Sequence, residues 1–250
     1  TILGGGAIGC EFAYFFNALG VKVVLVEKLP AIVQVMGQDI SRAVKTSLEK
    51  SGITIKTGIG AKDLKIDGEN KIVILENGEE ISSEEVLIAL GRTVDLSALN
   101  LEVLNINYDR KGVKVDPQTM LIRDNIYAIG DITGLSLLAH AASAQAQAAV
   151  NHILTGKGSY DNNLIPTVLY IHPEAASIGL TKEKASFPVK AHKSFYLANG
   201  RALSQNESDG FAQILTEEST GKIVGAQIVG AQAGELIHLV ALAIKNKNTL

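Results

Sequence analysis

Cysteine and tryptophan are almost missing from this chain of 250 residues, which holds one cysteine and no tryptophan. A single cysteine can form neither a disulfide within the chain nor a cysteine cluster for a metal ion. We expect it, as Cys10, to be a small buried residue on the first turn of a helix. An excess of positive charge is also missing, because 23 basic and 26 acidic residues give a formal net charge of −3. We therefore expect no nucleic-acid partner.

Long apolar runs are absent as well. No stretch approaches the roughly 20 apolar residues that cross a bilayer, so the sequence predicts no membrane span. No signal peptide is visible, and we expect a cytoplasmic location. Because the chain starts at Thr1 rather than at a methionine, we also expect an excised piece of a longer protein, with any organelle-targeting segment outside it. The composition, 46% hydrophobic and 20% charged, is typical of a globular protein.

A glycine-rich motif stands almost at the start of the chain. Residues 4–9 read Gly-Gly-Gly-Ala-Ile-Gly, which has the spacing G-x-G-x-x-G. An amphipathic helix is predicted after it, ended by Gly20, with an apolar face made of Ile8, Phe12, Phe15, Phe16 and Leu19. A predicted strand over 21–26 then leads to Glu27, within about 20 residues of the glycines. This arrangement is typical of a dinucleotide-binding unit.

Each part of that unit has a physical role. Gly4 allows a tight turn, Gly6 lets the backbone approach a pyrophosphate, and Gly9 lets helix and strand pack closely. The N-terminus of the helix favours the negative charge of the phosphates. Glu27 can accept both ribose hydroxyls and would repel a 2′-phosphate, so we predict NAD rather than NADP. The alternative is a glycine turn that binds nothing.

The strand and helix pattern divides the chain into three segments. In residues 1–92 we predict an α/β nucleotide-binding domain with a helix over 39–51 and parallel strands over 53–56 and 86–90. Three further strands, over 62–67, 71–75 and 79–81, form an antiparallel excursion with a hairpin at Asn77-Gly78. Residues 93–158, with strands over 112–116 and 126–131 and a helix over 137–154, are too few to bury a core alone. They are expected to be part of a second domain.

The strand and helix pattern changes again in residues 159–250 and predicts an α+β domain. We expect an antiparallel sheet with helices packed on one side. Its strands are predicted over 167–171, 175–180, 193–197, 211–216 and 222–228, and its main helix over 231–245.

Several motifs, taken in order, resemble those of the flavoprotein pyridine nucleotide-disulfide oxidoreductases. They are the loop at 4–11, Ala-Leu-Gly-Arg at 89–92 and Tyr-Ala-Ile-Gly-Asp at 127–131. The segments at 138–142, 169–174, 198–202 and 207–211 are similar to the dihydrolipoamide dehydrogenases of that family. The resemblance covers essentially the whole chain. It implies an NAD-binding domain, the second segment of an FAD-binding domain and a truncated dimer-interface domain.

The resemblance also implies cofactor contacts at matching positions. For NAD these are Gly4, Gly5, Gly6, Ala7, Ile8, Gly9, Glu11, Glu27, Ile59 and Gly91. For FAD they are Asp131, Leu137, Leu138, Ala139 and His140. Asp131 would accept hydrogen bonds from the ribityl chain, or it could merely cap a turn. The helix start at 137–140 would present backbone N–H groups to the flavin ring and favour its anionic reduced form. We predict no catalytic residue and no metal ligand.

The activity follows only from the resemblance. It implies that the parent protein oxidises protein-bound dihydrolipoamide and passes electrons through a disulfide and FAD to NAD. The family's redox disulfide and its catalytic His-Glu pair have no counterpart in these residues, so we expect this chain alone to be inactive. The implied partners are a second copy of the chain and the lipoyl domain and core subunit of a 2-oxoacid dehydrogenase complex.

Two other functions stay open. The parent could be another NAD(P)H-dependent flavin disulfide reductase, of the mercuric, glutathione or peroxidase type. Alternatively, the chain could be a stand-alone NAD-binding or dimerisation module without redox chemistry. Departures from the family pattern include Val94-Asp95 in place of Pro-Asn, Gln145-Ala146 in place of Glu-Gly, and Ile171 in place of a common Thr.

Overall fold

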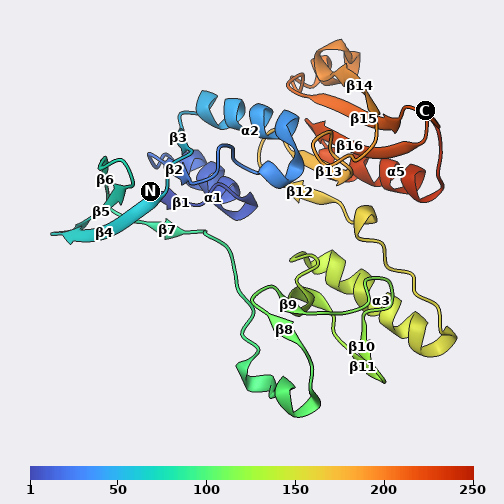
Figure 1. Ribbon diagram of the computed structural model, residues 1–250. Coiled ribbons are helices and arrows are strands. Elements are labelled where there is room, and N and C mark those ends of the chain that lie inside the picture. The colour runs from blue at the N-terminus through green and yellow to red at the C-terminus, as the bar shows by residue number, and fades with distance from the viewer. The chain divides into compact units, whose positions relative to one another are not determined.

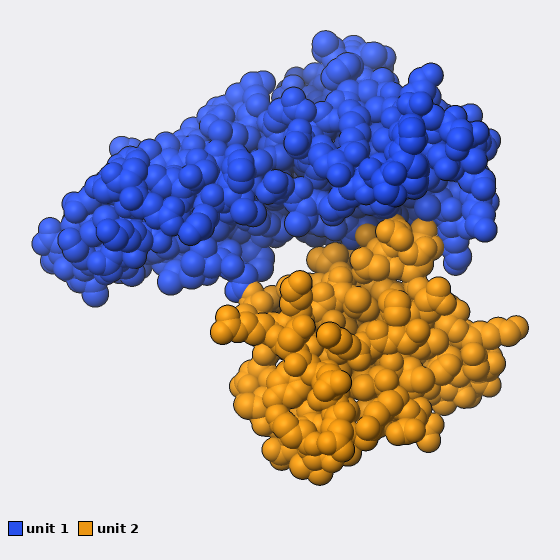
Figure 2. Space-filling view, viewed as in Figure 1, with its two compact units in different colours: residues 1–91, 166–250 blue, residues 92–165 orange.

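The computed structural model describes residues 1–250, and these form two compact units (Figure 2). Unit 1 consists of residues 1–91 and 166–250, and unit 2 of residues 92–165. The first and third predicted segments therefore share one unit. The division into three domains, 1–92, 93–158 and 159–250, stays a prediction.

A four-stranded parallel sheet forms the first part of unit 1 (Figure 1). Its strands, in the spatial order β3-β2-β1-β7, are β3 (Thr54–Thr57), β2 (Val24–Glu27), β1 (Ile2–Leu3) and β7 (Leu87–Ile88). Helix α1 (Ala7–Ala18) follows β1, and a short 3-10 turn η1 (Gln34–Met36) leads into helix α2 (Gln38–Lys50). All neighbouring strands are parallel, which confirms the predicted α/β sheet.

The antiparallel excursion is also confirmed. It comprises β4 (Ala61–Asp67), β5 (Asn70–Leu75) and β6 (Glu80–Ser83), paired in that order. The hairpin turn at Asn77-Gly78 has its glycine at φ +86°, and the Asn77 side chain accepts the Glu79 N–H at 3.0 Å. Val73 and Leu75 bury their side chains with Leu3 and Val26 in one apolar cluster, so the excursion packs against the parallel sheet.

Helix α1 forms where it was predicted, but its expected apolar face is not the buried one. Ile8, Phe12, Phe15 and Leu19 are exposed, by 42% to 67% of their surface, and only Phe16 is partly buried against the core. The helix instead buries its small residues Gly9, Cys10 and Ala13. Small side chains let a helix axis lie close to the sheet, so tight packing outweighed the burial of the large apolar residues.

A five-stranded antiparallel sheet forms the second part of unit 1. Its order is β12-β13-β16-β15-β14, with β12 (Thr167–Leu169), β13 (Ala175–Gly179), β16 (Ile223–Val229), β15 (Phe211–Glu217) and β14 (Val189–Phe195). Helix α5 (Ala233–Lys245) packs on one face through Ala233 and Ile237. A 3-10 turn η6 (Tyr196–Ala198) and a short helix α4 (Gly200–Ser204), both unpredicted, follow β14. The α+β architecture is confirmed.

Helix α5 packs on one side of this sheet as expected, but the opposite face is covered as well. Side chains alternate between the faces of a strand, so Ala226 and Ile228 face α5 while Gln227 and Val229 face the other way. The second face is covered by α2 and its approach, where Gln227 Nε2 donates to Met36 O at 2.6 Å. The sheet is therefore enclosed by helices from both parts of unit 1.

A half-buried carboxylate, Asp39, helps to join these two parts of unit 1. It accepts hydrogen bonds from Lys182 Nζ at 3.0 Å and from Gln213 Nε2 at 3.1 Å, and Lys193 Nζ lies at 3.5 Å. Burial by itself would raise the pKa of Asp39. The hydrogen bonds from Lys182 and Gln213 and the charge of Lys193 outweigh it, so the pKa lies below its usual value.

Unit 2 is built from short elements. In chain order they are η2 (Ser97–Leu99), η3 (Leu101–Leu104), β8 (Tyr108–Asp109), β9 (Gly112–Val113), β10 (Leu121–Arg123), β11 (Ile126–Tyr127), η4 (Gly130–Thr133), helix α3 (Ala139–Thr155) and η5 (Asn162–Leu164). The strands form two antiparallel pairs, β8-β9 and β10-β11. The predicted strands over 112–116 and 126–131 are shorter than expected, since Gly130 and Asp131 belong to the turn η4. No helix of the chain is long and apolar enough to cross a membrane.

Candidate functional site

Three segments meet at the carboxyl edge of the parallel sheet. The glycine loop, residues 4–9, includes the connection from β1 to α1 and the first residues of α1; Glu27 ends β2, and residues 89–91 follow β7. Gly4 N donates to Val26 O at 2.8 Å, and Ala89 N donates to Leu3 O at 2.7 Å, which ties all three together. Strand order reverses at β1, and such a switch point is where open α/β sheets bind ligands.

The glycines of the loop divide into two kinds. A Cβ on Gly4, at φ +108°, would lie 2.3 Å from the Ala89 carbonyl oxygen, and one on Gly9 would lie 1.8 Å from the Gly4 carbonyl oxygen. A Cβ on Gly6 would meet nothing within 4 Å. Packing therefore requires Gly4 and Gly9, whereas Gly6 leaves open space at the N-terminus of α1. That space suits the close approach of a phosphate.

Glu27 is held beside this loop by backbone groups. Its Oε2 accepts the Gly5 N–H at 2.6 Å, and its Oε1 accepts the Leu29 N–H at 2.7 Å. Ile59 is adjacent, since its N–H donates to the Glu27 carbonyl oxygen at 3.3 Å. The structure thus brings together the glycine loop, the acid and Ile59, and it fixes the direction of the carboxylate.

Cys10 lies buried under the loop. Its Sγ donates to the Gly5 carbonyl oxygen at 3.5 Å, and none of the residue is exposed. Burial, together with the charges of Glu27 and Glu11, raises the pKa of the thiol to about 12. The side chain is therefore a neutral packing group.

Two further predicted residues have different surroundings. Glu11, on α1, accepts the Tyr170 N–H at 2.9 Å and so ties the helix to the segment after β12. One of its oxygens is thus engaged by the protein backbone. Gly91 has φ +112°, and a Cβ there would meet nothing within 4 Å. It leaves the edge of the sheet open beside the loop.

The residues predicted for FAD lie in unit 2. Gly130 has φ +77° and begins the turn η4, which carries Asp131. Arg92 Nη1 lies 3.1 Å from Asp131 Oδ2, and Arg92 Nη2 donates to Leu137 O at 3.0 Å. Leu138 is the extended N-cap of α3, without a side-chain cap, and Ala139 and His140 form the first helical turn. Arg92 therefore joins the turn to the start of the helix.

The sequence prediction missed two contributors to this part. One is Arg92 itself, although it stood in a recognised motif. The other is Gln145, a fully buried side chain whose Oε1 accepts the Gly130 N–H at 2.7 Å. The available signal was its position, because it shares a helical face with Ala141 and Ala148 and so had to be buried.

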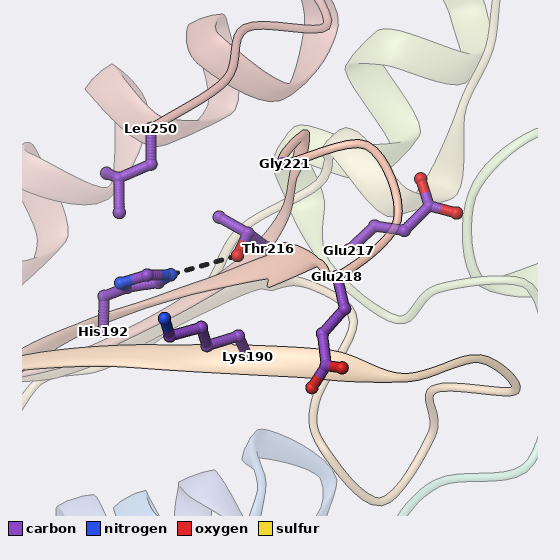
Figure 3. Close-up of a pocket in the computed structure, with 7 residues that line it drawn as sticks. All are labelled: Lys190, His192, Thr216, Glu217, Glu218, Gly221 and Leu250. Carbon is purple, nitrogen blue, oxygen red and sulfur yellow. Dashed lines mark hydrogen bonds between the residues drawn. The ribbon is translucent and has the colours of Figure 1, made fainter.

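A separate hollow lies on the antiparallel sheet of unit 1 (Figure 3). Its volume is about 490 Å³, and its walls include Lys190, His192, Glu217 and Glu218. His192 Nε2 lies 3.0 Å from Thr216 Oγ1. None of the predicted cofactor residues lines it, so it contributes nothing to the sites described above.

Known proteins resemble this chain along its whole length. The model of the pyridine nucleotide-disulphide oxidoreductase family matches residues 1–148, and the model of that family's dimerisation domain matches residues 165–250. Dihydrolipoyl dehydrogenase of Chlamydia pneumoniae is 38% identical over 100% of this chain and 55% of its own length. The enzyme of the same name from Synechocystis sp. is 34% identical over 100% of this chain and 57% of its own.

Two solved structures also resemble this chain in fold. LpdA from Mycobacterium tuberculosis superposes with a TM-score of 0.91 at 26% identity, over 99% of this chain and 55% of that one. The flavoprotein disulfide reductase RclA from Escherichia coli, with a TM-score of 0.88 at 24% identity over 99% of this chain and 57% of its own, supports the fold alone. The chain spans about half the length of the curated relatives it matches. The family expected from the motifs is confirmed: the chain belongs to the pyridine nucleotide-disulphide oxidoreductases.

Proposed function

We propose that this chain is the NAD-binding portion, with part of the FAD-binding portion, of a flavoenzyme that oxidises protein-bound dihydrolipoamide. The observation that carries the proposal is the glycine loop of unit 1. Gly6 leaves open space at the N-terminus of α1, and the Glu27 carboxylate is held beside it by two backbone N–H groups.

In this proposal the loop binds the pyrophosphate of NAD. The N–H groups of residues 6–9 begin a helix and have no partners within it, so they can donate to phosphate oxygens. Glu27 accepts the adenosine ribose hydroxyls, Ile59 flanks the adenine, and Gly91 contacts the cofactor through its backbone. Gly4, Gly5, Ala7 and Ile8 complete the loop, and Glu11 lies toward the nicotinamide.

The proposed FAD contacts belong to unit 2. Asp131 accepts hydrogen bonds from ribityl hydroxyls, in competition with its ion pair to Arg92. Leu137, Leu138, Ala139 and His140 present backbone groups at the start of α3, where no side chain caps the helix. The positive end of that helix favours negative charge on the group it faces. A bound flavin supplies the transfer of two electrons between a dithiol and a nicotinamide.

The proposed substrate and partners rest on the names of the relatives. Both curated relatives described above are dihydrolipoyl dehydrogenases, which supports dihydrolipoamide on a lipoyl domain of a 2-oxoacid dehydrogenase complex as the substrate. The match to a dimerisation domain supports a homodimer. Cys10 cannot form a redox disulfide alone, so we propose that these 250 residues are inactive by themselves. A cytoplasmic location stays a prediction from the sequence.

Nucleotide titrations test the proposal directly. We expect the chain to bind NADH at least about tenfold more tightly than NADPH, because Glu27 would repel a 2′-phosphate. The variant Glu27→Gln should lose about tenfold in NADH affinity and most of that preference. Glu49→Gln, which removes a carboxylate from exposed α2 surface, is the control and should match the parent chain. Equal affinity for both nucleotides, or none for either, would contradict NAD binding at this loop.

The substrate needs a second experiment on the complete flavin-loaded polypeptide. Turnover with dihydrolipoamide, oxidised glutathione and mercuric ion should be compared under the same conditions. Dihydrolipoamide should be strongly preferred. Comparable turnover with either of the other two would replace the proposed substrate by that of another disulfide reductase.

A further inference from the structure

Gln145 is the one polar side chain on the buried face of α3. That face also contains Ala141, Ala148 and Ala149, and none of the Gln145 side chain is exposed. A buried amide is unfavourable unless both of its ends are hydrogen-bonded. Its partners therefore explain why this position holds an amide.

Both the oxygen and the nitrogen of the Gln145 amide make hydrogen bonds. The Gly130 N–H donates to Gln145 Oε1 at 2.7 Å, and Gln145 Nε2 donates to the Tyr160 hydroxyl at 3.4 Å. That hydroxyl in turn donates to Asn162 Oδ1 at 2.8 Å. A backbone N–H can only donate, so the oxygen of the amide must face Gly130. Burial raises the pKa of Tyr160, which keeps its hydroxyl protonated as the donor to Asn162.

At its other end, this series of hydrogen bonds reaches the turn that carries Asp131. Gly130 lies at φ +77°, and its carbonyl oxygen accepts the Thr133 hydroxyl at 2.9 Å. Gln145 and Thr133 thus hold the two polar groups of the Gly130 backbone. The bond to Gln145 fixes the peptide plane that enters Gly130, and the bond to Thr133 fixes the peptide plane that leads on to Asp131.

We propose that Gln145 is a positioning residue, which holds the Gly130 turn so that the Asp131 carboxylate points at the ribityl hydroxyls of FAD. The inference rests on the proposed function, in which Asp131 makes that contact. The Tyr160 hydroxyl pairs with the nitrogen of the Gln145 amide, and the oxygen of that amide holds the start of the turn. A side chain of similar size without an oxygen, such as leucine, would leave the Gly130 N–H buried and unpaired.

The test measures FAD affinity and amide hydrogen exchange in the complete flavoprotein. Gln145→Leu should raise the FAD dissociation constant by about tenfold, the effect of one lost buried hydrogen bond. It should also speed hydrogen exchange at the Gly130 amide. Gln145→Glu keeps an oxygen for that amide and should restore FAD affinity to within about threefold of the parent value. The control is Ala148→Gly, which destabilises the same face of α3 but touches no part of the turn.

The outcomes separate this inference from the function on which it rests. Parent-like FAD affinity in Gln145→Leu, while Asp131→Asn binds FAD weakly, would overturn the inference alone. An equal loss of FAD affinity in Ala148→Gly and Gln145→Leu would also overturn it, since general destabilisation would then be the cause. If Asp131→Asn binds FAD as tightly as the parent protein, the proposed role of Asp131 fails and the inference fails with it.

Discussion

The glycine loop at 4–9 and the Gly130-Asp131 turn both place a carboxylate near the start of a helix, but they are held in different ways. In the loop, backbone packs on backbone, and the absent side chains of Gly4 and Gly9 make this possible. At Gly130 the turn is held by side chains, namely Thr133 within the turn and Gln145 on helix α3. The loop therefore depends on close backbone contacts, whereas the turn depends on hydrogen bonds from side chains.

Gly9→Val should break the loop and have the largest effect. Its Cβ would lie 1.8 Å from the Gly4 carbonyl oxygen, a collision that only a backbone shift can relieve. We expect the free energy of unfolding to fall by more than about 3 kcal/mol, measured by urea denaturation. A midpoint equal to that of the parent chain would show that the loop adapts, and the comparison with the Gly130 turn would fail.

The residue under each turn should also behave differently, because Gln145 bonds its turn through an amide whereas Cys10 has only a weak donor, its thiol. Since the pKa of Cys10 is raised to about 12, almost no thiolate exists near neutral pH, and reactivity should increase as the pH rises toward that value. Alkylation by iodoacetamide at pH 8 should be roughly a thousandfold slower in the folded chain than in urea. Mass spectrometry gives both rates, and similar values would mean that the loop opens readily.

Gly6→Ala sharpens the comparison by separating binding from stability. An added Cβ meets nothing within 4 Å, so the free energy of unfolding should change by less than about 0.5 kcal/mol. NADH affinity should fall about tenfold, because the methyl group would occupy the space proposed for the pyrophosphate. Gly200→Ala, where a Cβ also meets nothing, is the matched control and should change neither quantity. Unchanged NADH affinity in Gly6→Ala would place the nucleotide elsewhere.

Gly130→Ala should reduce stability much less than Gly9→Val. Its Cβ would meet only the Ala142 Cβ, at an ordinary 3.6 Å, so the cost comes from the positive φ alone. We expect a loss of about 1 kcal/mol in the free energy of unfolding, measured by urea denaturation beside Gly9→Val. A loss as large as that of Gly9→Val would mean that both turns are equally sensitive to added side chains.

Helix α1 shows where reasoning from sequence pattern failed. The predicted apolar face, made of Ile8, Phe12, Phe15, Phe16 and Leu19, is exposed except for the partly buried Phe16. The helix instead buries Gly9, Cys10 and Ala13. Periodicity identifies an apolar side of a helix, but it does not say which side meets the sheet. Here Gly9, which has no side chain, lets the helix lie close to the backbone at Gly4, and this close packing decided which face of α1 is buried.

Local sequence determined the elements whose shape depends on their own residues. Three such features could be predicted from the sequence: the glycine spacing, the acid at Glu27 and the Asn77-Gly78 hairpin. Tight turns need residues that tolerate positive φ or supply a nearby carboxylate, and these residue types are visible in the sequence. The parallel character of the first sheet, the antiparallel character of the second and the family followed from the same patterns.

Only the tertiary structure decided what depends on such contacts. It packed α2 against the antiparallel sheet, where Asp39 meets Lys182 and Gln213, and it placed Gln145 under the Gly130 turn. A buried polar group takes whichever partners the fold brings within hydrogen-bond distance, and sequence spacing does not specify them. The glycine loop could thus be predicted in detail from sequence, whereas the support of Asp131 could not.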